Sequence, residues 1–167
     1  FLTYKYPKGD EITPQQKTYI QAYVDSFENS LSSANFADPA TGFRKYIEPQ
    51  SFMDFFFMQE MSKSVDAYKR SAYLYKDKNS VDRKLHAGPH WDYNSAWNVK
   101  IGGCEPFDSD TGWTYAMTCW IHGTNYPVPF WWKRLLQDTT YTRDLKCRWL
   151  QLRSTTLSNA NIFQIMD

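Results

Sequence analysis

Residues 49–62, PQSFMDFFFMQEMS, are the feature that most restricts how this chain can fold. Read as a helix that begins at Pro49, the segment carries apolar side chains around nearly its whole circumference. They are Phe52, Met53, Phe55, Phe56, Phe57, Met58 and Met61. Such a helix needs cover on all sides, because exposing it would leave a large apolar surface in water. We therefore predict that it is the central element of a domain.

Four further helices are predicted from spacing and capping signals. Residues 14–32 combine the capping-box residues Thr13 and Gln16 with apolar residues at helical spacing. The other three run from Pro129 to about residue 136, from a cap at Thr139 or Thr140 to about residue 152, and onward from a cap at Ser158.

The predicted β structure is small. Ser71–Tyr75 and Lys84–Ala87 are typical of two short strands, and the charged turn between them makes an antiparallel hairpin. The remaining expectations are a strand or extended connector at residues 1–7 and a long loop at 98–127 with one strand at 114–121. The pattern predicts an α+β fold that is mainly helical.

Composition limits the class of protein. The chain has 167 residues, 18% of them aromatic, which suffices for one domain at 1–167 with a core built largely from rings. Its net charge of +1 gives no basic surface for nucleic acid or an anionic membrane. The densest apolar run, residues 52–58, is interrupted by Asp54 and is far shorter than the roughly 20 residues of a membrane span. We therefore expect no nucleic-acid partner and no membrane span.

Two aspartates stand next to these elements. Asp66 follows the apolar helix, and Asp92 lies between Trp91 and Tyr93, directly after the second predicted strand. Two carboxylates held in turns beside buried rings suit phosphoryl transfer on Mg²⁺, where one binds the metal and the other orients a nucleophile. Aspartate is also a common turn residue, and the spacing alone fits simple turn capping better.

Four segments, in order, resemble the CotH family of spore-coat-type atypical protein kinases, especially secreted members from Bacteroidetes-like bacteria. They are YIEPQSFMDFFFMQEMSKSVDAYKRSAYLYKD, KLHAGPHWDYN, VPFWWKRLLQD and KCRWLQLR, and they cover most of the chain. The resemblance implies the C-terminal lobe of an atypical protein-kinase-like fold, with the antiparallel hairpin at its active site.

The resemblance also implies a reaction. A kinase of this family transfers the γ-phosphoryl group of ATP to a protein hydroxyl with the help of Mg²⁺ or Mn²⁺. By this resemblance Asp66 is the catalytic residue that orients the acceptor, and Asp92 is a metal ligand. Asn94 follows at a spacing that places its carbonyl beside the same ion.

Four neighbouring residues are weaker candidates for contact with nucleotide or phosphate. Lys69 and Arg70 supply positive charge, and Trp91 supplies a ring on which adenine can stack. Ser71 stands five residues after Asp66, where kinases carry an Asn that binds a second metal ion. Its hydroxyl can donate a hydrogen bond or supply one ligand oxygen, although a plain strand-edge hydroxyl fits better.

The motifs of a nucleotide-binding lobe are missing from the sequence. It contains no GxGxxG, no P-loop, and no strand with a phosphate-binding lysine before residue 14. We therefore expect that the N-terminal lobe is absent and that the fragment is inactive, or nearly so, by itself.

The family likeness also implies an extracytoplasmic or cell-surface bacterial protein. In that environment Cys104 and Cys119 are the first pair to test for a disulfide. Three free buried thiols, with Cys147 the third, are the alternative.

Three other interpretations stay open. The chain can be a non-catalytic surface or coat-assembly module that binds protein or glycan through exposed rings, or a glycoside hydrolase with a carboxylate pair. His86, His90 and Asp92 also form a pattern suited to a transition metal. Gly88 and Pro89 prevent the helix that usually presents such ligands, so we expect both histidines to be polar hairpin residues.

Overall fold

The computed structural model describes residues 2–64, 66–97, 111–116, 120–121, 124–125 and 127–166. They belong to two compact units, Phe1–Tyr46 and Ile47–Asp167. The structure is α+β and mainly helical, with two small antiparallel sheets in the described residues. Every candidate site residue belongs to the second unit. The prediction of a single domain stays a prediction.

The first unit is built around α1, Pro14–Ser32, whose bounds match the prediction. The Thr13 hydroxyl accepts from the Gln16 backbone N–H at 3.2 Å, and the Gln16 side chain accepts from the Thr13 N–H at 2.8 Å, which completes the capping box. A short 3₁₀ helix, η1, spans Phe43–Lys45. The strand expected at the start does not form, because residues 5–10 turn instead of extending.

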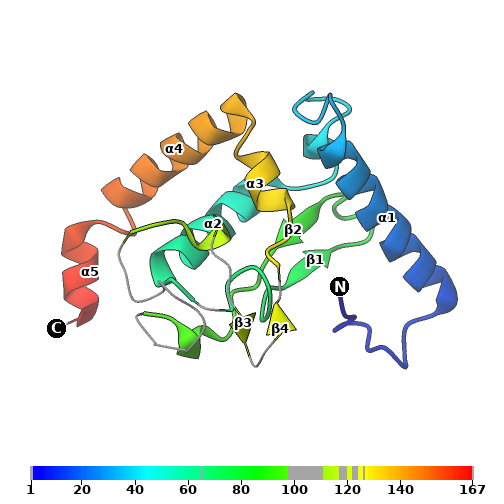
Figure 1. The fold of residues 1–167 in the computed structure, drawn as a ribbon, viewed down its shortest axis with the longest axis horizontal. Coiled ribbons are helices and arrows are strands. Elements are labelled where there is room, and N and C mark those ends of the chain that lie inside the picture. Colours follow the sequence, from blue (N-terminus) through cyan, green and yellow to red (C-terminus); the bar gives the residue numbers. More distant parts are fainter. Residues whose placement is uncertain are drawn as a thin grey trace. The chain divides into compact units, whose positions relative to one another are not determined.

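The second unit is organised by α2, Pro49–Ser62, again as predicted. Glu48 caps it by accepting from the backbone N–H groups of Gln50 and Ser51. Phe52, Met53, Phe55 and Phe56 are buried. The helix contacts the strand β2 (Leu85–Ala87) and the helix α4 (Thr139–Ser154), both labelled in Figure 1, and the 3₁₀ helix η3 (Thr114–Ala116). The apolar helix is therefore central to its unit.

The hairpin pairs β1, Leu74–Lys76, with β2, Leu85–Ala87, and Tyr75 faces His86. β1 starts later than the predicted Ser71, because Ser71 has a left-handed backbone with φ 44° that no strand accommodates. The Glu48 N–H donates to the Leu85 carbonyl at 2.9 Å. This bond ties the start of α2 to the hairpin.

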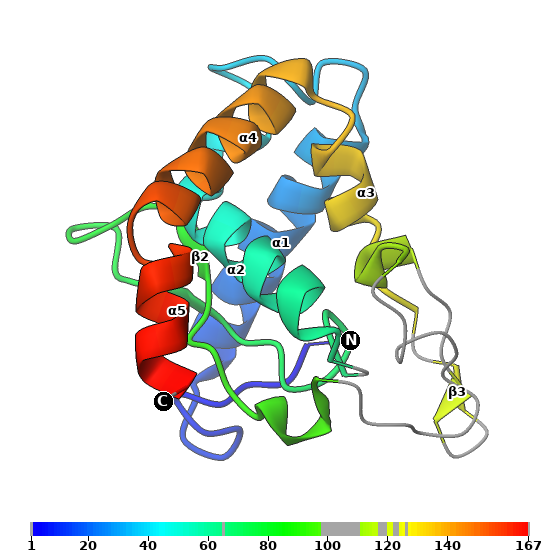
Figure 2. The same ribbon diagram turned by 90° about the vertical axis from the view of Figure 1, so that its left-hand side faces the viewer.

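The remaining elements follow the hairpin in sequence. They are η2 (Tyr93–Ser95), η3 (Thr114–Ala116), β3 (Trp120–Ile121), β4 (Thr124–Asn125), α3 (Trp131–Leu135), α4 (Thr139–Ser154) and α5 (Asn159–Met166). The strand predicted at 114–121 is confirmed only at its end, since η3 occupies residues 114–116 and β3 residues 120–121. Asp138, rather than Thr139 or Thr140, caps α4 by accepting from the Thr140 N–H. In Figure 2, α4 runs beside α2 and α5 turns away beyond the end of α4.

A bidentate ion pair fastens α4 to α2. Arg148 donates from Nε to Asp54 Oδ1 at 2.8 Å and from a terminal nitrogen to Asp54 Oδ2 at 2.9 Å. The parallel fork geometry of such a pair fixes orientation as well as distance. It explains why an aspartate interrupts the apolar run of α2.

Two further expectations concern thiols and membranes. Cys147 is exposed and free, so it is not a buried thiol, whereas Cys104 and Cys119 lie outside the described residues. None of the helices in the described part of the chain is both long and apolar enough to cross a membrane.

The core role of α2 predicts a contrast between two phenylalanines. Phe52 is fully buried and lies 5.6 Å from the Trp132 ring, whereas Phe163 in α5 is 59% exposed. Phe52→Ala should lower the free energy of unfolding by about 3–5 kcal/mol through lost burial and a cavity. Phe163→Ala should change it by less than about 0.5 kcal/mol. Urea denaturation followed by circular dichroism measures both, and equal effects would contradict the assigned core.

Candidate functional site

Asp66 lies in a tight turn that begins just after the end of α2. The turn is held by the Asp66 carbonyl, which accepts from the backbone N–H groups of Lys69 and Arg70 at 3.1 and 3.0 Å. The Asp66 side chain is half-buried, and its Oδ1 is buried without a hydrogen-bond partner. A buried carboxylate oxygen costs free energy unless something hydrogen-bonds or coordinates it. The turn therefore presents an uncommitted acceptor.

Tyr68 anchors this turn to α2. Its hydroxyl donates to Glu60 Oε1 at 2.8 Å, and its ring lies 4.7 Å from that of Trp132. Both Tyr68 and Glu60 are buried. Burial, and secondarily the negative charge of Glu60, raise the pKa of Tyr68 well above its ordinary 10.0. The phenol therefore stays protonated and can donate to the carboxylate.

Glu60 also organises the segment around η3. Its Oε2 accepts from the Thr114 N–H at 2.7 Å, and its Oε1 accepts from the Tyr115 N–H at 3.0 Å. With the Tyr68 hydroxyl, the carboxylate thus receives three hydrogen bonds, as a buried charge requires. One side chain of α2 holds both the Asp66 turn and η3.

Asp92 stands at the end of the second strand segment, immediately before η2. It is exposed, and its backbone is left-handed with φ 65°. The Ser71 hydroxyl donates to Asp92 Oδ2 at 3.0 Å. The structure thereby brings together the end of the Asp66 turn and Asp92, across the hairpin that separates them in sequence. Oδ1 of Asp92 takes no part in this bond.

The backbone around these residues is strained. The described non-glycine residues with positive φ are Lys63, Tyr68, Ser71, Asp92 and Trp97, and all lie between positions 63 and 97. Each such conformation costs of order 1–3 kcal/mol and persists only where the surroundings enforce it. Strain of this kind gathers at functional sites, which supports placing the site here.

The weaker candidates differ in their surroundings. The Lys69 Nζ atom is buried and has no hydrogen-bond partner; burial lowers the pKa of Lys69, and the charge of Asp66 opposes that shift. Arg70 is exposed. Trp91 is 62% exposed, so it does not pack Asp92 into place. Asn94 is an exposed residue of η2.

The two histidines take separate partners. His86 Nε2 is 2.7 Å from Asp82 Oδ2, and its ring stacks on Tyr75. His90 Nδ1 is 3.0 Å from the Tyr93 hydroxyl, and one face of its otherwise exposed ring stacks on Phe55. That cover lowers the pKa of His90 by desolvation, which the charge of Asp54 partly offsets.

Tyr93 continues this network into α2. Its hydroxyl accepts from the buried Gln59 side-chain amide at 3.0 Å. Burial raises the pKa of Tyr93. Tyr93 therefore fastens the residue next to Asp92 to the central helix, in the way that Tyr68 fastens the Asp66 turn.

The donor set suits a hard cation. Asp92 offers a carboxylate oxygen and the exposed Asn94 an amide carbonyl, and oxygen ligands are those that Mg²⁺ prefers. Among the described residues, no group of three or more His, Cys, Asp or Glu side chains is placed to hold a metal ion. One or two carboxylates that share Mg²⁺ with substrate phosphates fit that arrangement.

Gln59, Glu60 and Tyr68 were missed by the sequence analysis. The signal was available for the first two, because polar residues in a helix that is apolar nearly all round are expected to be buried and hydrogen-bonded. Nothing in the sequence indicates which groups satisfy them, because their partners lie many residues away in the chain.

Comparisons with known proteins gave one match. The family model described as CotH kinase protein matches residues 2–167. No curated protein and no solved structure matches the chain.

The Tyr68–Glu60 bond predicts a stability effect. Tyr68→Phe keeps the ring but removes one of three donors from a buried carboxylate, so the free energy of unfolding should fall by about 1–3 kcal/mol. Tyr75→Phe, at a tyrosine that is 48% exposed, is the matched control and should change it by less than about 0.5 kcal/mol. The urea midpoint at unchanged slope measures both. Equal midpoints for the two variants would count against the Glu60 anchor.

The raised pKa of Tyr68 predicts a second difference at alkaline pH. Above the ordinary phenol pKa of 10.0, Tyr68 ionises in the unfolded chain but stays protonated in the folded one, so stability falls as pH rises. Tyr68→Phe lacks this contribution. The stability gap between wild type and variant should therefore narrow by about 1 kcal/mol between pH 9 and pH 11. Urea titrations at both pH values test this, and a constant gap would show that Tyr68 ionises normally.

Proposed function

The chain belongs to the CotH kinase protein family, and from that membership we propose that it carries the acceptor-orienting and metal-binding residues of a protein kinase. The reaction is transfer of the γ-phosphoryl group of ATP to a protein hydroxyl. The observation that carries the proposal is the 3.0 Å hydrogen bond from Ser71 to Asp92, since it joins the Asp66 turn to the second carboxylate. This chemistry uses one carboxylate to bind the metal ion and another to orient the acceptor.

In this proposal Asp66 acts on the acceptor. Its half-buried carboxylate would accept the hydrogen bond of the incoming hydroxyl and take up the proton as the oxygen–phosphorus bond forms. The bond between the γ-phosphorus and the bridging oxygen breaks, and ADP leaves. Lys69, a buried cation in the same turn, is positioned to balance the charge that Asp66 and the phosphate bring together.

Asp92 and Asn94 are the proposed ligands of Mg²⁺ or Mn²⁺. When bound, the ion would neutralise the charge of the ATP phosphates and hold them in line for transfer. Ser71 takes the part of a positioning residue, because its hydrogen bond fixes which carboxylate oxygen of Asp92 points away from the turn. Trp91 and Arg70 are exposed beside these residues and are proposed to contact nucleotide or phosphate.

We further propose that residues 1–167 form the larger lobe of a kinase-like fold, outside the cytoplasm or on the cell surface. The sequence contains no GxGxxG or P-loop motif, and no VAIK-like segment precedes residue 14. In this proposal a separate lobe supplies those parts, and the 167 residues alone transfer phosphate poorly or not at all.

One observation favours a second candidate function. Trp91, Trp97 and Trp113 are 62%, 63% and 57% exposed, which is unusual for the largest apolar side chain. Exposed indoles are typical of surfaces that bind protein or glycan. A non-catalytic surface or coat-assembly module is therefore the alternative.

The proposal predicts the effect of removing Asp92. In the full-length protein, Asp92→Ala should lower transfer of ³²P from ATP to a protein acceptor by roughly 10²–10³-fold, a loss typical of one electrostatic group at a reacting centre. Asp77→Ala, at an exposed aspartate of the hairpin turn, is the control and should leave the rate unchanged.

Two results would decide against the proposal. Undiminished transfer by Asp92→Ala would remove Asp92 from the reaction. A full-length protein that transfers no phosphate and gains no thermal stability from millimolar ATP with Mg²⁺ would favour the non-catalytic module, because a ligand of the folded state must stabilise it.

A further inference from the structure

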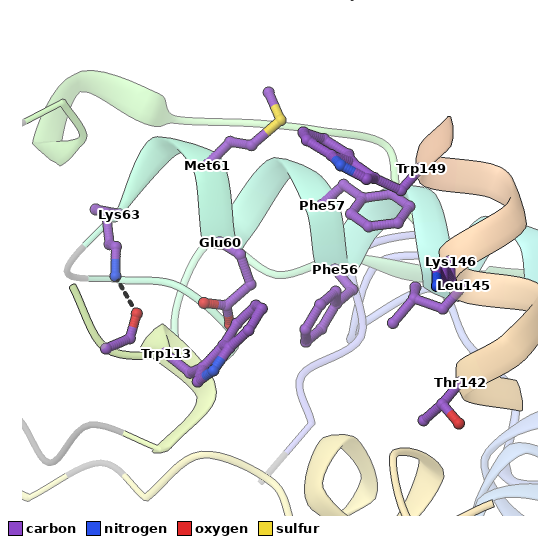
Figure 3. Close-up of a pocket in the computed structure, with 11 residues that line it drawn as sticks. Phe56, Phe57, Glu60, Met61, Lys63, Trp113, Thr142, Leu145, Lys146 and Trp149 are labelled. Atoms are coloured by element: carbon purple, nitrogen blue, oxygen red, sulfur yellow. Dashed lines mark hydrogen bonds between the residues drawn. The ribbon is translucent and has the colours of Figure 1, made fainter. Parts of the chain in front are cut away.

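A pocket of about 580 Å³ lies between α2, α4 and the segment before η3 (Figure 3). α2 contributes Phe56 and Phe57 to its lining, α4 contributes Leu145 and Trp149, and Trp113 forms the facing side. The volume falls within the roughly 300–1,000 Å³ typical of ligand sites, and the lining is mostly aromatic. None of these five residues has a part in the proposed phosphoryl transfer.

The Trp113 side of the pocket is held in place from two directions. The Glu60 carboxylate accepts from the backbone N–H groups of Thr114 and Tyr115, directly after Trp113. The Lys63 ammonium donates to the carbonyls of Thr111 and Gly112, directly before it. The Trp113 ring is 57% exposed although its backbone is fixed on both sides. An exposed ring on a fixed backbone loses little entropy when it binds a partner.

Among the described residues that line the pocket, the charge that remains without a partner is positive. Lys146 lines the pocket, is exposed, and forms no ion pair with another described residue. The other ionic groups nearby are already used: Glu60 receives three hydrogen bonds, Lys63 donates to two carbonyls, and Arg148 is paired with Asp54. A ligand with a carboxylate next to its apolar part would therefore complement the pocket.

We propose that this pocket binds a peptide segment of a partner protein that presents aromatic or aliphatic side chains next to acidic ones. The lining residues of α4, Thr142, Leu145, Lys146 and Trp149, follow helical spacing along one face. Together with α2 they form an open groove between two helices, the geometry that accepts an amphipathic helix through apolar anchors. The acidic residues of the peptide face Lys146. The proposal goes beyond phosphoryl transfer and does not depend on it.

Two synthetic peptides test the proposal on the full-length protein. The first is a blocked, fluorescein-labelled helical peptide of about twelve residues with Trp and Leu four positions apart and glutamates on the remaining faces. In the second, lysines replace the glutamates. Fluorescence anisotropy at about 0.1 M salt measures both dissociation constants.

Three variants locate the binding. Trp113→Ala should raise the dissociation constant of the acidic peptide by about tenfold or more, because it truncates an aromatic anchor. Lys146→Glu should raise the dissociation constant of the acidic peptide several-fold and lower that of the lysine peptide. Arg143→Glu makes the same charge change on α4 at an exposed residue outside the pocket, and it should have no effect beyond twofold. Urea midpoints of all three verify that they fold.

Several outcomes would overturn the proposal. It fails if the acidic peptide does not bind at millimolar concentration, or if it binds equally well to wild type, Trp113→Ala and Lys146→Glu. It also fails if the lysine peptide binds wild type as tightly as the acidic one, because Lys146 then does not favour acidic side chains. Because binding is measured without ATP, the result is independent of whether the protein transfers phosphate.

Discussion

The Glu60 carboxylate is the interaction on which the rest of the second unit depends. A buried charge is tolerated only when hydrogen bonds replace the water that it has lost, and Glu60 receives three of them from Tyr68, Thr114 and Tyr115. These donors come from two segments that also pack aromatic rings against α2, Tyr68 against Phe55 and Trp113 against Phe56. Each hydrogen bond to a charged group contributes about 1.5–3 kcal/mol. The position of Glu60 on the rigid central helix therefore sets the positions of the Asp66 turn and of η3.

This anchoring explains how the unit tolerates a strained site. The turn and the segment around Asp92 contain non-glycine residues with positive φ, among them Tyr68, Ser71 and Asp92. Their cost, of order 1–3 kcal/mol each, is offset by burial of Tyr68 against Trp132 and by the network that ties Tyr93 to Gln59. The strain has a consequence for chemistry. It directs Ser71 and Asp92 toward each other, and a relaxed strand at position 71 would not do so.

Local signals in the sequence predicted the parts of the fold that local interactions determine. α1 and α2 have the predicted bounds because Thr13, Gln16, Glu48 and the two prolines act within a few residues of the helix starts. The start of the strand expected at 114–121 was wrong because residues 114–116 form η3, whose first N–H donates to Glu60, a residue distant in sequence. Asp66 and Asp92 could be proposed as site residues from their neighbours in the sequence and from the family resemblance. The Ser71–Asp92 bond could not be predicted, because Asp tolerates a left-handed backbone but nothing in the sequence indicates one at Ser71.

The same carboxylate also connects the site to the aromatic pocket. Glu60 Oε1 binds the Tyr68 hydroxyl in the Asp66 turn, while Oε2 binds the N–H that follows Trp113 in the pocket wall. The loss of either hydrogen bond changes the charge distribution on the Glu60 carboxylate, and with it the strength of the other hydrogen bond, because the same carboxylate accepts both. The energies of two such places do not add, because they share a partner. The Asp66 turn and the pocket wall are thus two parts of one hydrogen-bonded structure on α2, and displacing either one costs the other part of its stabilisation.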